Sequence, residues 1–176
     1  PVPPTTQKAA DVLEQVIRIF RELSKPSERT VQGLWAELFI LAGAIAPAVV
    51  ALAWRNSAFD RTDFATEHQR LEVKSSSGAT RSHRFGAEQL WLPSGVNGIV
   101  ASLFCQRSSG GMSVGELWNA VRSRVSADPA LLLRVDGIVS ETLGDAWKES
   151  LMIRFDWRTA RETLRFYDMN TIPAIG

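Results

Sequence analysis

Two carboxylates and one ammonium group lie close together in the sequence, in a pattern that could bind a metal ion and support hydrolysis. Asp63 is followed nine positions later by Glu72, and Lys74 comes two residues further on. Burying such charges on an otherwise apolar sheet is costly unless something compensates them, and a divalent cation would do so. The alternative is a surface hairpin with a cross-strand ion pair, because clusters of charged side chains are often structural. Spacing alone leaves both interpretations open.

A β-hairpin would bring these three side chains onto one face of a ribbon. The sequence predicts strands over residues 61–66 and 69–76, with the turn between them. In this register Asp63 lies directly opposite Glu72. Residues two apart on a strand share a face, so Lys74 would project beside Glu72. The predicted hairpin therefore places two acids and one base at the same point.

Composition and length bound the classes of protein to which the chain can belong. Its 176 residues suffice for one domain, 1–176, with residues 1–6 as a flexible lead-in. The net charge of +1 means that any affinity for nucleic acid must come from a local basic surface. The single Cys105 excludes an internal disulfide and a cysteine-based zinc site, which is typical of the reducing cytoplasm. The sequence contains neither a membrane span nor a signal-peptide pattern. Because it starts at Pro1 without a Met, it is also compatible with a fragment of a longer chain.

Helices are expected before the hairpin. Apolar residues at helical spacing predict a first helix over 7–24 and a second over 28–43, with Ser27 as the N-cap of the second. The apolar stripe predicted for the second helix extends to Ile45. Glu37 lies on the flank of that stripe, where taken alone it is expected to be a solvated residue. A short apolar helix is expected over 47–54.

The remainder of the chain alternates between strands and helices. A turn-rich break at 75–79, a short strand over 81–85, a helical turn at 86–91, a covered strand over 98–106 and a loop at 108–111 are predicted. Ser113 and Glu116 form a capping-box pattern, and Asp128 and Pro129 open a further helix. Strands over 151–157 and 163–169 would turn near Arg158. This order predicts an α/β fold with a central mixed β-sheet flanked by helices.

Several ordered motifs resemble those of the PD-(D/E)XK nuclease superfamily, which includes many restriction endonucleases. The chain is most similar to a largely uncharacterised group of bacterial PD-(D/E)XK motif proteins. The resemblance rests on Gly33 to Leu38 on a helix, Trp54, Asp63-Phe64, Leu71 to Ser75, Ser82 to Arg84, Glu88 to Leu90, and Ile172-Pro173. Thr62 stands before the first acid, where the superfamily pattern has Pro, which is a common variation. The resemblance implies a restriction-endonuclease-like core.

The resemblance also implies roles for the charged residues. Asp63 and Glu72 would be metal ligands together with the Val73 carbonyl, and Mg²⁺ would be the ion, with Mn²⁺ as a substitute. Lys74 would orient or deprotonate the attacking water and stabilise the developing negative charge. Further members of the implied site are Glu37, which could hold a metal-bound water or a second ion, and Gln89, which would lie at the cleft edge and position the phosphate or the site. Asp60 competes with Asp63 as the first acid, and the hairpin register favours Asp63.

Basic residues around the site suggest contacts to duplex DNA. The candidates are Arg70, Arg81, His83 and Arg84, with a second basic stretch from Arg154 to Arg165. The resemblance implies a Mg²⁺-dependent DNA endonuclease of bacterial restriction or phage defence, acting as a homodimer or with other subunits of a defence system. Two alternatives remain: an idle nuclease-like domain that binds DNA or a partner protein, and a nuclease for branched DNA or RNA.

Overall fold

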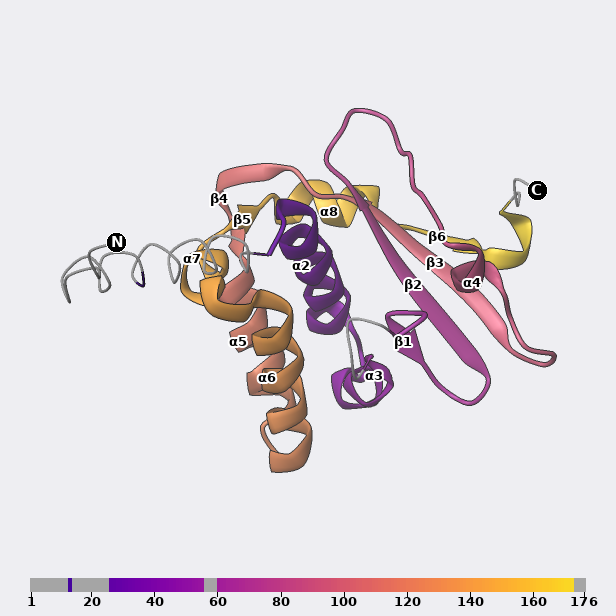
Figure 1. The fold of residues 1–176 in the computed structure, drawn as a ribbon, viewed down its shortest axis with the longest axis horizontal. Coiled ribbons are helices and arrows are strands. Elements are labelled where there is room, and N and C mark those ends of the chain that lie inside the picture. Colours follow the sequence, from indigo (N-terminus) through magenta and orange to yellow (C-terminus); the bar gives the residue numbers. More distant parts are fainter. Residues whose placement is uncertain (1–12, 14–25, 56–59, 173–176) are drawn as a thin grey trace, which may run out of the picture.

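The structure is a computed structural model that describes residues 13, 26–55 and 60–172. The expected lead-in at 1–6 and the helix predicted over 7–24 lie outside the described residues, apart from residue 13. Figure 1 shows a β-sheet on one side, a pair of long helices on the other, and a central helix between them. The predicted α/β fold with a mixed central sheet flanked by helices is confirmed.

The central helix is α2 (Glu28–Gly43), and it begins as predicted. The Ser27 hydroxyl accepts a hydrogen bond from the Thr30 backbone N–H at 3.1 Å, which satisfies one of the open donors of the first turn. Leu34 and Trp35 are fully buried on its inner face. The prediction was wrong for Ile45, which is fully exposed because the helix has already ended. The predicted short apolar helix is confirmed as α3 (Pro47–Ala53).

The main sheet has the strand order β1-β2-β3-β6. The hairpin strands β1 (Phe64–Ala65) and β2 (Gln69–Ser76) are antiparallel. β2 pairs in parallel with β3 (Asn97–Phe104), after a connection that contains the short helix α4 (Ala87–Leu90), and β3 pairs antiparallel with β6 (Arg165–Asp168). Cys105 directly follows β3 and is buried, and burial raises the pKa of its thiol to about 12. A buried thiol of this kind is a poor nucleophile.

The loop predicted at 108–111 is instead part of a second, two-stranded sheet. This segment belongs to β4 (Arg107–Ser113), which pairs with β5 (Arg154–Phe155). A Cβ added at Gly111 would clash with the Phe155 carbonyl oxygen. The glycine here allows two backbones to approach closely, whereas the sequence pattern suggested a turn. The break predicted at 75–79 begins too early, because β2 continues through Ser76.

Two further strand predictions need correction. Residues 81–85 form no strand and run as an irregular segment before α4. The predicted C-terminal hairpin is replaced by α7 (Trp147–Leu151), β5, α8 (Trp157–Thr163) and β6. The Asp156 side chain caps α8 by accepting from the Arg158 and Thr159 backbone N–H groups, so a helix begins where a turn was expected. β5 and β6 consequently join different sheets.

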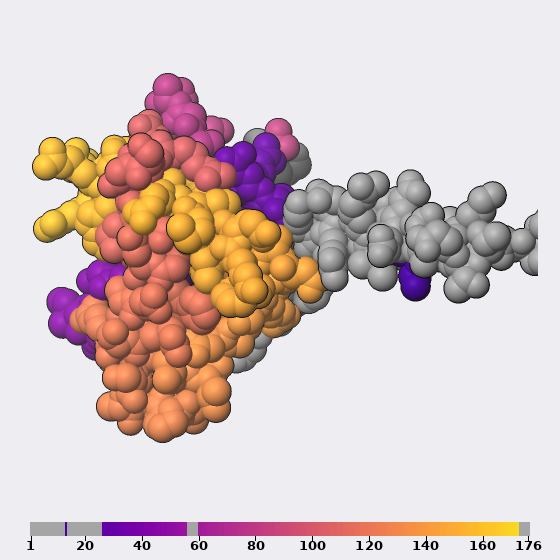
Figure 2. All heavy atoms as spheres, turned by 90° about the vertical axis from the view of Figure 1, so that its left-hand side faces the viewer, coloured from indigo at the N-terminus to yellow at the C-terminus, as the bar shows by residue number. Residues whose placement is uncertain are grey.

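The outer helices begin at the predicted caps. α5 (Val114–Val125) follows the capping box of Ser113 and Glu116, and α6 (Pro129–Leu143) follows Asp128. Short 3₁₀ segments, η1 (Gly144–Ala146) and η2 (Met169–Thr171), complete the described elements. On the face shown in Figure 2, the segments from β4 to α7 form one continuous surface. Among the described helices, none is long and apolar enough to span a membrane.

Candidate functional site

The hairpin brings Asp63 and Glu72 together in the predicted register. Phe64 pairs with Leu71 and Ala65 with Arg70, and continuing this antiparallel register by one pair brings Asp63 opposite Glu72. On the other edge of β1, Trp54 forms a β-bridge with Phe64, and the Asp63 carbonyl accepts a hydrogen bond from the Arg55 backbone N–H at 2.7 Å. The Asp63 carboxylate reaches across to β2, where its Oδ2 accepts from the Val73 backbone N–H at 2.7 Å.

Glu72 lies at the centre of a hydrogen-bonded group. Its side chain is buried, and Oε1 contacts Lys74 Nζ at 2.8 Å and accepts from Gln89 Nε2 at 2.6 Å. Lys74 Nζ also donates to Gln89 Oε1 at 3.1 Å, so the glutamine bridges the acid and the base. The second oxygen of Glu72, Oε2, is buried and has no hydrogen-bond partner. A buried carboxylate oxygen in this state is costly, and a ligand would relieve the cost.

Gln89 is positioned by the start of α4. Its Oε1 accepts a hydrogen bond from the Gly86 backbone N–H at 3.0 Å, which holds the side chain over the first turn of the helix. The amide group is therefore oriented with its NH₂ toward Glu72. Phe85 lies just before this helix, and the Lys74 ammonium is 5.0 Å from the centre of its ring. Lys74 thus has three neighbours, Glu72, Gln89 and Phe85, that fix its position.

Glu37 is buried, so the expectation of a solvated flank residue was wrong. Only 7% of its surface is exposed. Its Oε2 accepts hydrogen bonds from Trp54 Nε1 at 2.6 Å and from Arg55 Nε at 3.0 Å. Arg55 Nη2 in turn donates to Thr142 Oγ1 on α6 at 3.0 Å. The helical acid is therefore tied to the chain segment beside β1, next to the hairpin carboxylates.

The three carboxylates act on one another electrostatically. Burial raises the pKa of Asp63 well above its ordinary value, and the charges of Glu37 and Glu72 raise it further, against the Val73 N–H and Arg55. Burial also raises the pKa of Glu72, while Lys74 acts in the opposite direction and Glu37 adds to the rise. Mutual repulsion of this kind favours either protonation or a bound cation.

The residues present fit a divalent ion with few protein ligands. Within residues 13, 26–55 and 60–172, no three His, Cys, Asp or Glu side chains form a ready-made metal-binding group. Mg²⁺, however, is commonly held by one or two carboxylates and keeps several waters. Asp63 and Glu72 supply such oxygens, and the partnerless Oε2 of Glu72 is an open ligand position. Val73, the third ligand expected, lies between Glu72 and Lys74 in β2, and its N–H already binds Asp63.

Asp60, the alternative candidate for the first acid of the motif, has different neighbours from those of Asp63. Asp60 is exposed and interacts electrostatically with Arg134 on α6. Asp63, in contrast, interacts with Glu37 and Glu72. The geometry therefore favours Asp63, as the hairpin register did.

Of the basic residues expected to contact nucleic acid, Arg81 and His83 lie near Lys74, whereas Arg70 lies at the hairpin turn. Arg81 and His83 both hydrogen-bond to Ser102 Oγ, the His83 Nε2 at 2.6 Å, and Ser102 pairs with Lys74 across the parallel strands. Burial lowers the pKa of His83, and the charges of Arg81 and Lys74 lower it further. Arg84 is exposed beyond them.

Arg70 lies at the hairpin turn, where its guanidinium donates to the Thr66 and Gln69 carbonyls. The second basic stretch is partly structural, because Arg154 is paired with Glu116 at 2.9 Å.

Sequence reasoning missed Arg55 and Ser102 as neighbours of the site. Both act through contacts between residues distant in sequence, Arg55 with Glu37 and Ser102 with Arg81 and His83. Neither residue stands in a pattern of spacing that predicts such contacts. The one available signal is Ser102 itself, a polar residue inside an otherwise apolar strand, which is buried.

One family model matches nearly the whole chain. It covers residues 3–176 and represents the family DUF4420, described as "Putative PD-(D/E)XK family member". In the other two comparisons, no curated protein and no solved structure matches the chain.

Proposed function

Because the chain belongs to the DUF4420 family of PD-(D/E)XK type, we propose that it is a metal-dependent DNA endonuclease that hydrolyses phosphodiester bonds, with a role in bacterial restriction or phage defence. The observation that supports this most is the arrangement around Glu72. One of its oxygens is held by Lys74 and Gln89, and the other is buried without a partner beside Asp63. A purely structural ion pair gives no reason for that open oxygen.

The residues of the site would divide the work of hydrolysis. A divalent ion held by Asp63 and Glu72 would supply charge neutralisation at the phosphate. Lys74, held by Glu72 and Gln89, would orient the attacking water and, as a cation, stabilise the negative charge that builds up on the phosphate. Gln89 would fix the position of Lys74. Glu37 would act as a positioning residue through Trp54 and Arg55.

An idle nuclease-like domain that binds DNA or a partner protein is the second candidate. One observation favours it: Glu72, Lys74 and Gln89 already satisfy one another, and Asp63 is bound to the Val73 N–H, so the described group is partly closed. Such a domain would bind nucleic acid without cleaving it. A nuclease for branched DNA or RNA would share the same catalytic group and differ in the surrounding surface.

Cleavage of plasmid DNA by the purified protein in Mg²⁺, Mn²⁺ or EDTA tests the proposal. We expect nicking or linearisation with either ion and none in EDTA. Lys74→Ala should reduce the rate by about 10²–10⁴-fold, since the lysine acts on the transition state. Lys148→Ala removes an exposed lysine on α7 and should cleave like the wild type. Metal-dependent cleavage by Lys74→Ala at the wild-type rate would refute the catalytic role, and binding without cleavage by the wild type would support the idle domain.

A further inference from the structure

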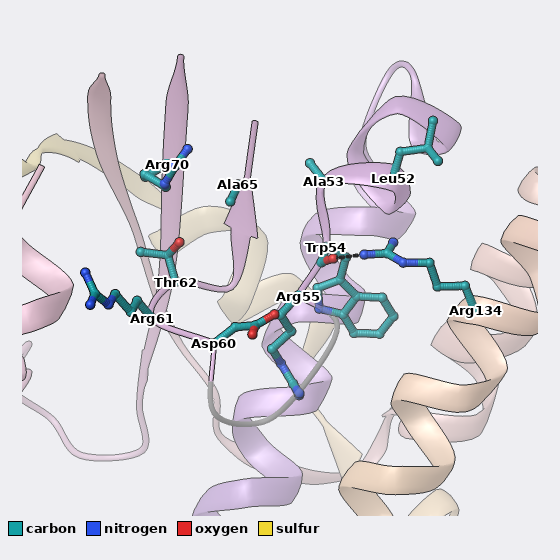
Figure 3. A pocket seen from close by; sticks show the side chains of 10 residues that line it. All are labelled: Leu52, Ala53, Trp54, Arg55, Asp60, Arg61, Thr62, Ala65, Arg70 and Arg134. Atoms are coloured by element: carbon teal, nitrogen blue, oxygen red, sulfur yellow. Dashed lines mark hydrogen bonds between the residues drawn. The ribbon is translucent and has the colours of Figure 1, made fainter. Parts of the chain in front are cut away.

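A pocket rich in arginine lies beside the carboxylate group. Its volume is about 250 Å³, and it lies between the end of α3, the hairpin and α6. Figure 3 shows that its wall includes Arg55, Arg61, Arg70 and Arg134, together with Asp60 and Thr62. The described lining residues thus include four arginines and one carboxylate; Arg55 is turned toward Glu37, and Arg134 donates to the Ala51 and Trp54 carbonyls. The catalytic roles proposed above do not use this pocket.

The pocket and the candidate site share walls. Thr62 and Ala65 line the pocket on either side of Asp63 in the sequence. Arg70 pairs with Ala65 and lies two residues before Glu72, so it projects from the same face of β2, about 7 Å along the strand. Arg55 lines the pocket as well, and its Nε binds Glu37. A group bound in the pocket would therefore lie close to the carboxylates of Asp63 and Glu72.

The charges in the pocket favour an anion. The central carbon of the Arg61 guanidinium lies 6.0 Å from the centre of the Trp91 ring, and the Arg70 guanidinium donates to main-chain carbonyls. In the described part of the chain, neither is paired with a carboxylate, so no neighbouring acid neutralises these two charges. Burial lowers the pKa of Arg134, opposed by Asp60, as expected for a cation withdrawn from water. An anion in the pocket would be attracted by the positive charges of Arg61 and Arg70.

Phosphate is the anion that matches these donors. Guanidinium groups present several N–H donors in a planar fork that fits phosphate oxygens, and they remain charged at any working pH. The lining is mostly polar, with Arg61, Thr62 and Arg70 among its residues, and its size allows a phosphate with its ester linkages. An apolar base would gain little from such a wall.

We propose that this arginine pocket binds a phosphate group of the nucleic-acid strand next to the phosphate that is cleaved, and thereby sets the position of the strand over the carboxylates. The identity of the ligand rests on the proposed function. The phosphate is either an internal diester of the strand or a terminal 5′-monoester, and the two share the same chemistry.

Binding of short duplex oligonucleotides in EDTA tests the pocket without any cleavage. The variant Arg61→Gln/Arg70→Gln removes two positive charges from the wall, and Arg29→Gln/Arg124→Gln removes two exposed arginines on α2 and α5 as a matched control. If the pocket holds an internal phosphate, the slope of log K against log salt concentration should fall by about 0.9 for each phosphate that the pocket variant no longer neutralises. The control should bind with a smaller change in slope.

A second pair of variants leaves every arginine of the pocket in place. Ala65→Asp sets a negative charge opposite Arg70 in the pocket wall, and Ala65→Asn has nearly the same shape without the charge. The aspartate should weaken binding of the duplex at least several-fold more than the asparagine does. Equal binding by these two variants, together with equal salt slopes for the two arginine variants, would overturn the proposal.

Oligonucleotides with a 5′-phosphate or a 5′-hydroxyl distinguish the two sources of phosphate. A wild-type preference for the 5′-phosphate that disappears in Arg61→Gln/Arg70→Gln identifies a terminal monoester, and an unchanged slope with no such preference contradicts both sources. The outcome is independent of the cleavage test. Pocket-dependent binding without cleavage would refute only the proposed enzyme, whereas cleavage with pocket-independent binding would refute only the phosphate pocket.

Discussion

At the scale of single residues, the partnerless oxygen of Glu72 and the raised pKa of Asp63 have the same cause, which is an excess of buried negative charge. Each group is buried close to other carboxylates without enough positive charge to balance them. Lys74 and Arg55 are both present, but each is already held by one acid, Lys74 by Glu72 and Arg55 by Glu37. A site in this state is less stable than it could be, which is common where function requires strained electrostatics.

Asp63→Asn should therefore stabilise the metal-free protein. An acid whose pKa is higher in the folded state binds more protons folded than unfolded, so its contribution to stability is lost as pH rises from the ordinary aspartate pKa through the raised value. Asparagine can still accept from the Val73 N–H and has no charge to bury. In EDTA at neutral pH we expect the variant to melt about 2–4 °C higher than the wild type. The difference should vanish toward about pH 3, below the ordinary aspartate pKa, as thermal melts over a pH series will show.

With a divalent ion present, the wild type should melt at a higher temperature than Asp63→Asn. Mg²⁺ at about 100 times its dissociation constant would stabilise the wild type by about 2.7 kcal/mol, because the ion binds only the folded state. Asp63→Asn lacks one ligand charge and should gain little. Thermal melts with and without Mg²⁺ measure both effects. An equal increase in melting temperature for the two proteins would show that Asp63 does not bind the ion.

At the scale of elements, the close approach of β4 and β5 depends on one glycine. The Cβ of an alanine at position 111 would clash with the Phe155 carbonyl oxygen, and the backbone on both sides cannot easily move away. Gly111→Ala should lower the free energy of unfolding by about 1–3 kcal/mol. Gly110→Ala lies in the same strand with nothing within 4 Å of the added Cβ, and should change stability by no more than about 0.5 kcal/mol. Urea denaturation of both variants measures the difference, and equal values would contradict the close contact.

At the scale of the whole molecule, one chain of contacts links the helical layer to the site. Glu37 on α2 binds Trp54 and Arg55, and Arg55 binds Thr142 on α6. The position of the helical acid therefore depends on the packing of α2 and α6 as much as on the hairpin. This explains how an outer helix can influence the carboxylates.

Replacing Thr142 tests this link. Thr142→Val keeps the shape of the side chain but removes the oxygen that accepts from Arg55, and should lower the free energy of unfolding by about 1 kcal/mol. Because Arg55 also holds Glu37, plasmid cleavage should slow in the same variant. Thr142→Ser keeps the hydroxyl and should restore the cleavage rate. Failure of serine to restore a lowered rate would show that the effect comes from packing alone.

Local patterns were enough to predict α2, α3, α5, α6 and the central hairpin. Ser27, the pair Ser113 and Glu116, and Asp128 mark helix starts because a cap binds backbone groups within its own turn. The register that brings Asp63 to Glu72 also follows from alternation along two adjacent strands. The burial of Glu37, its ties to Trp54 and Arg55, the extended run through Gly111 and the arginine pocket all depend on residues that are far apart in sequence. Such contacts form only when separate elements pack, and spacing along one segment carries no information about them.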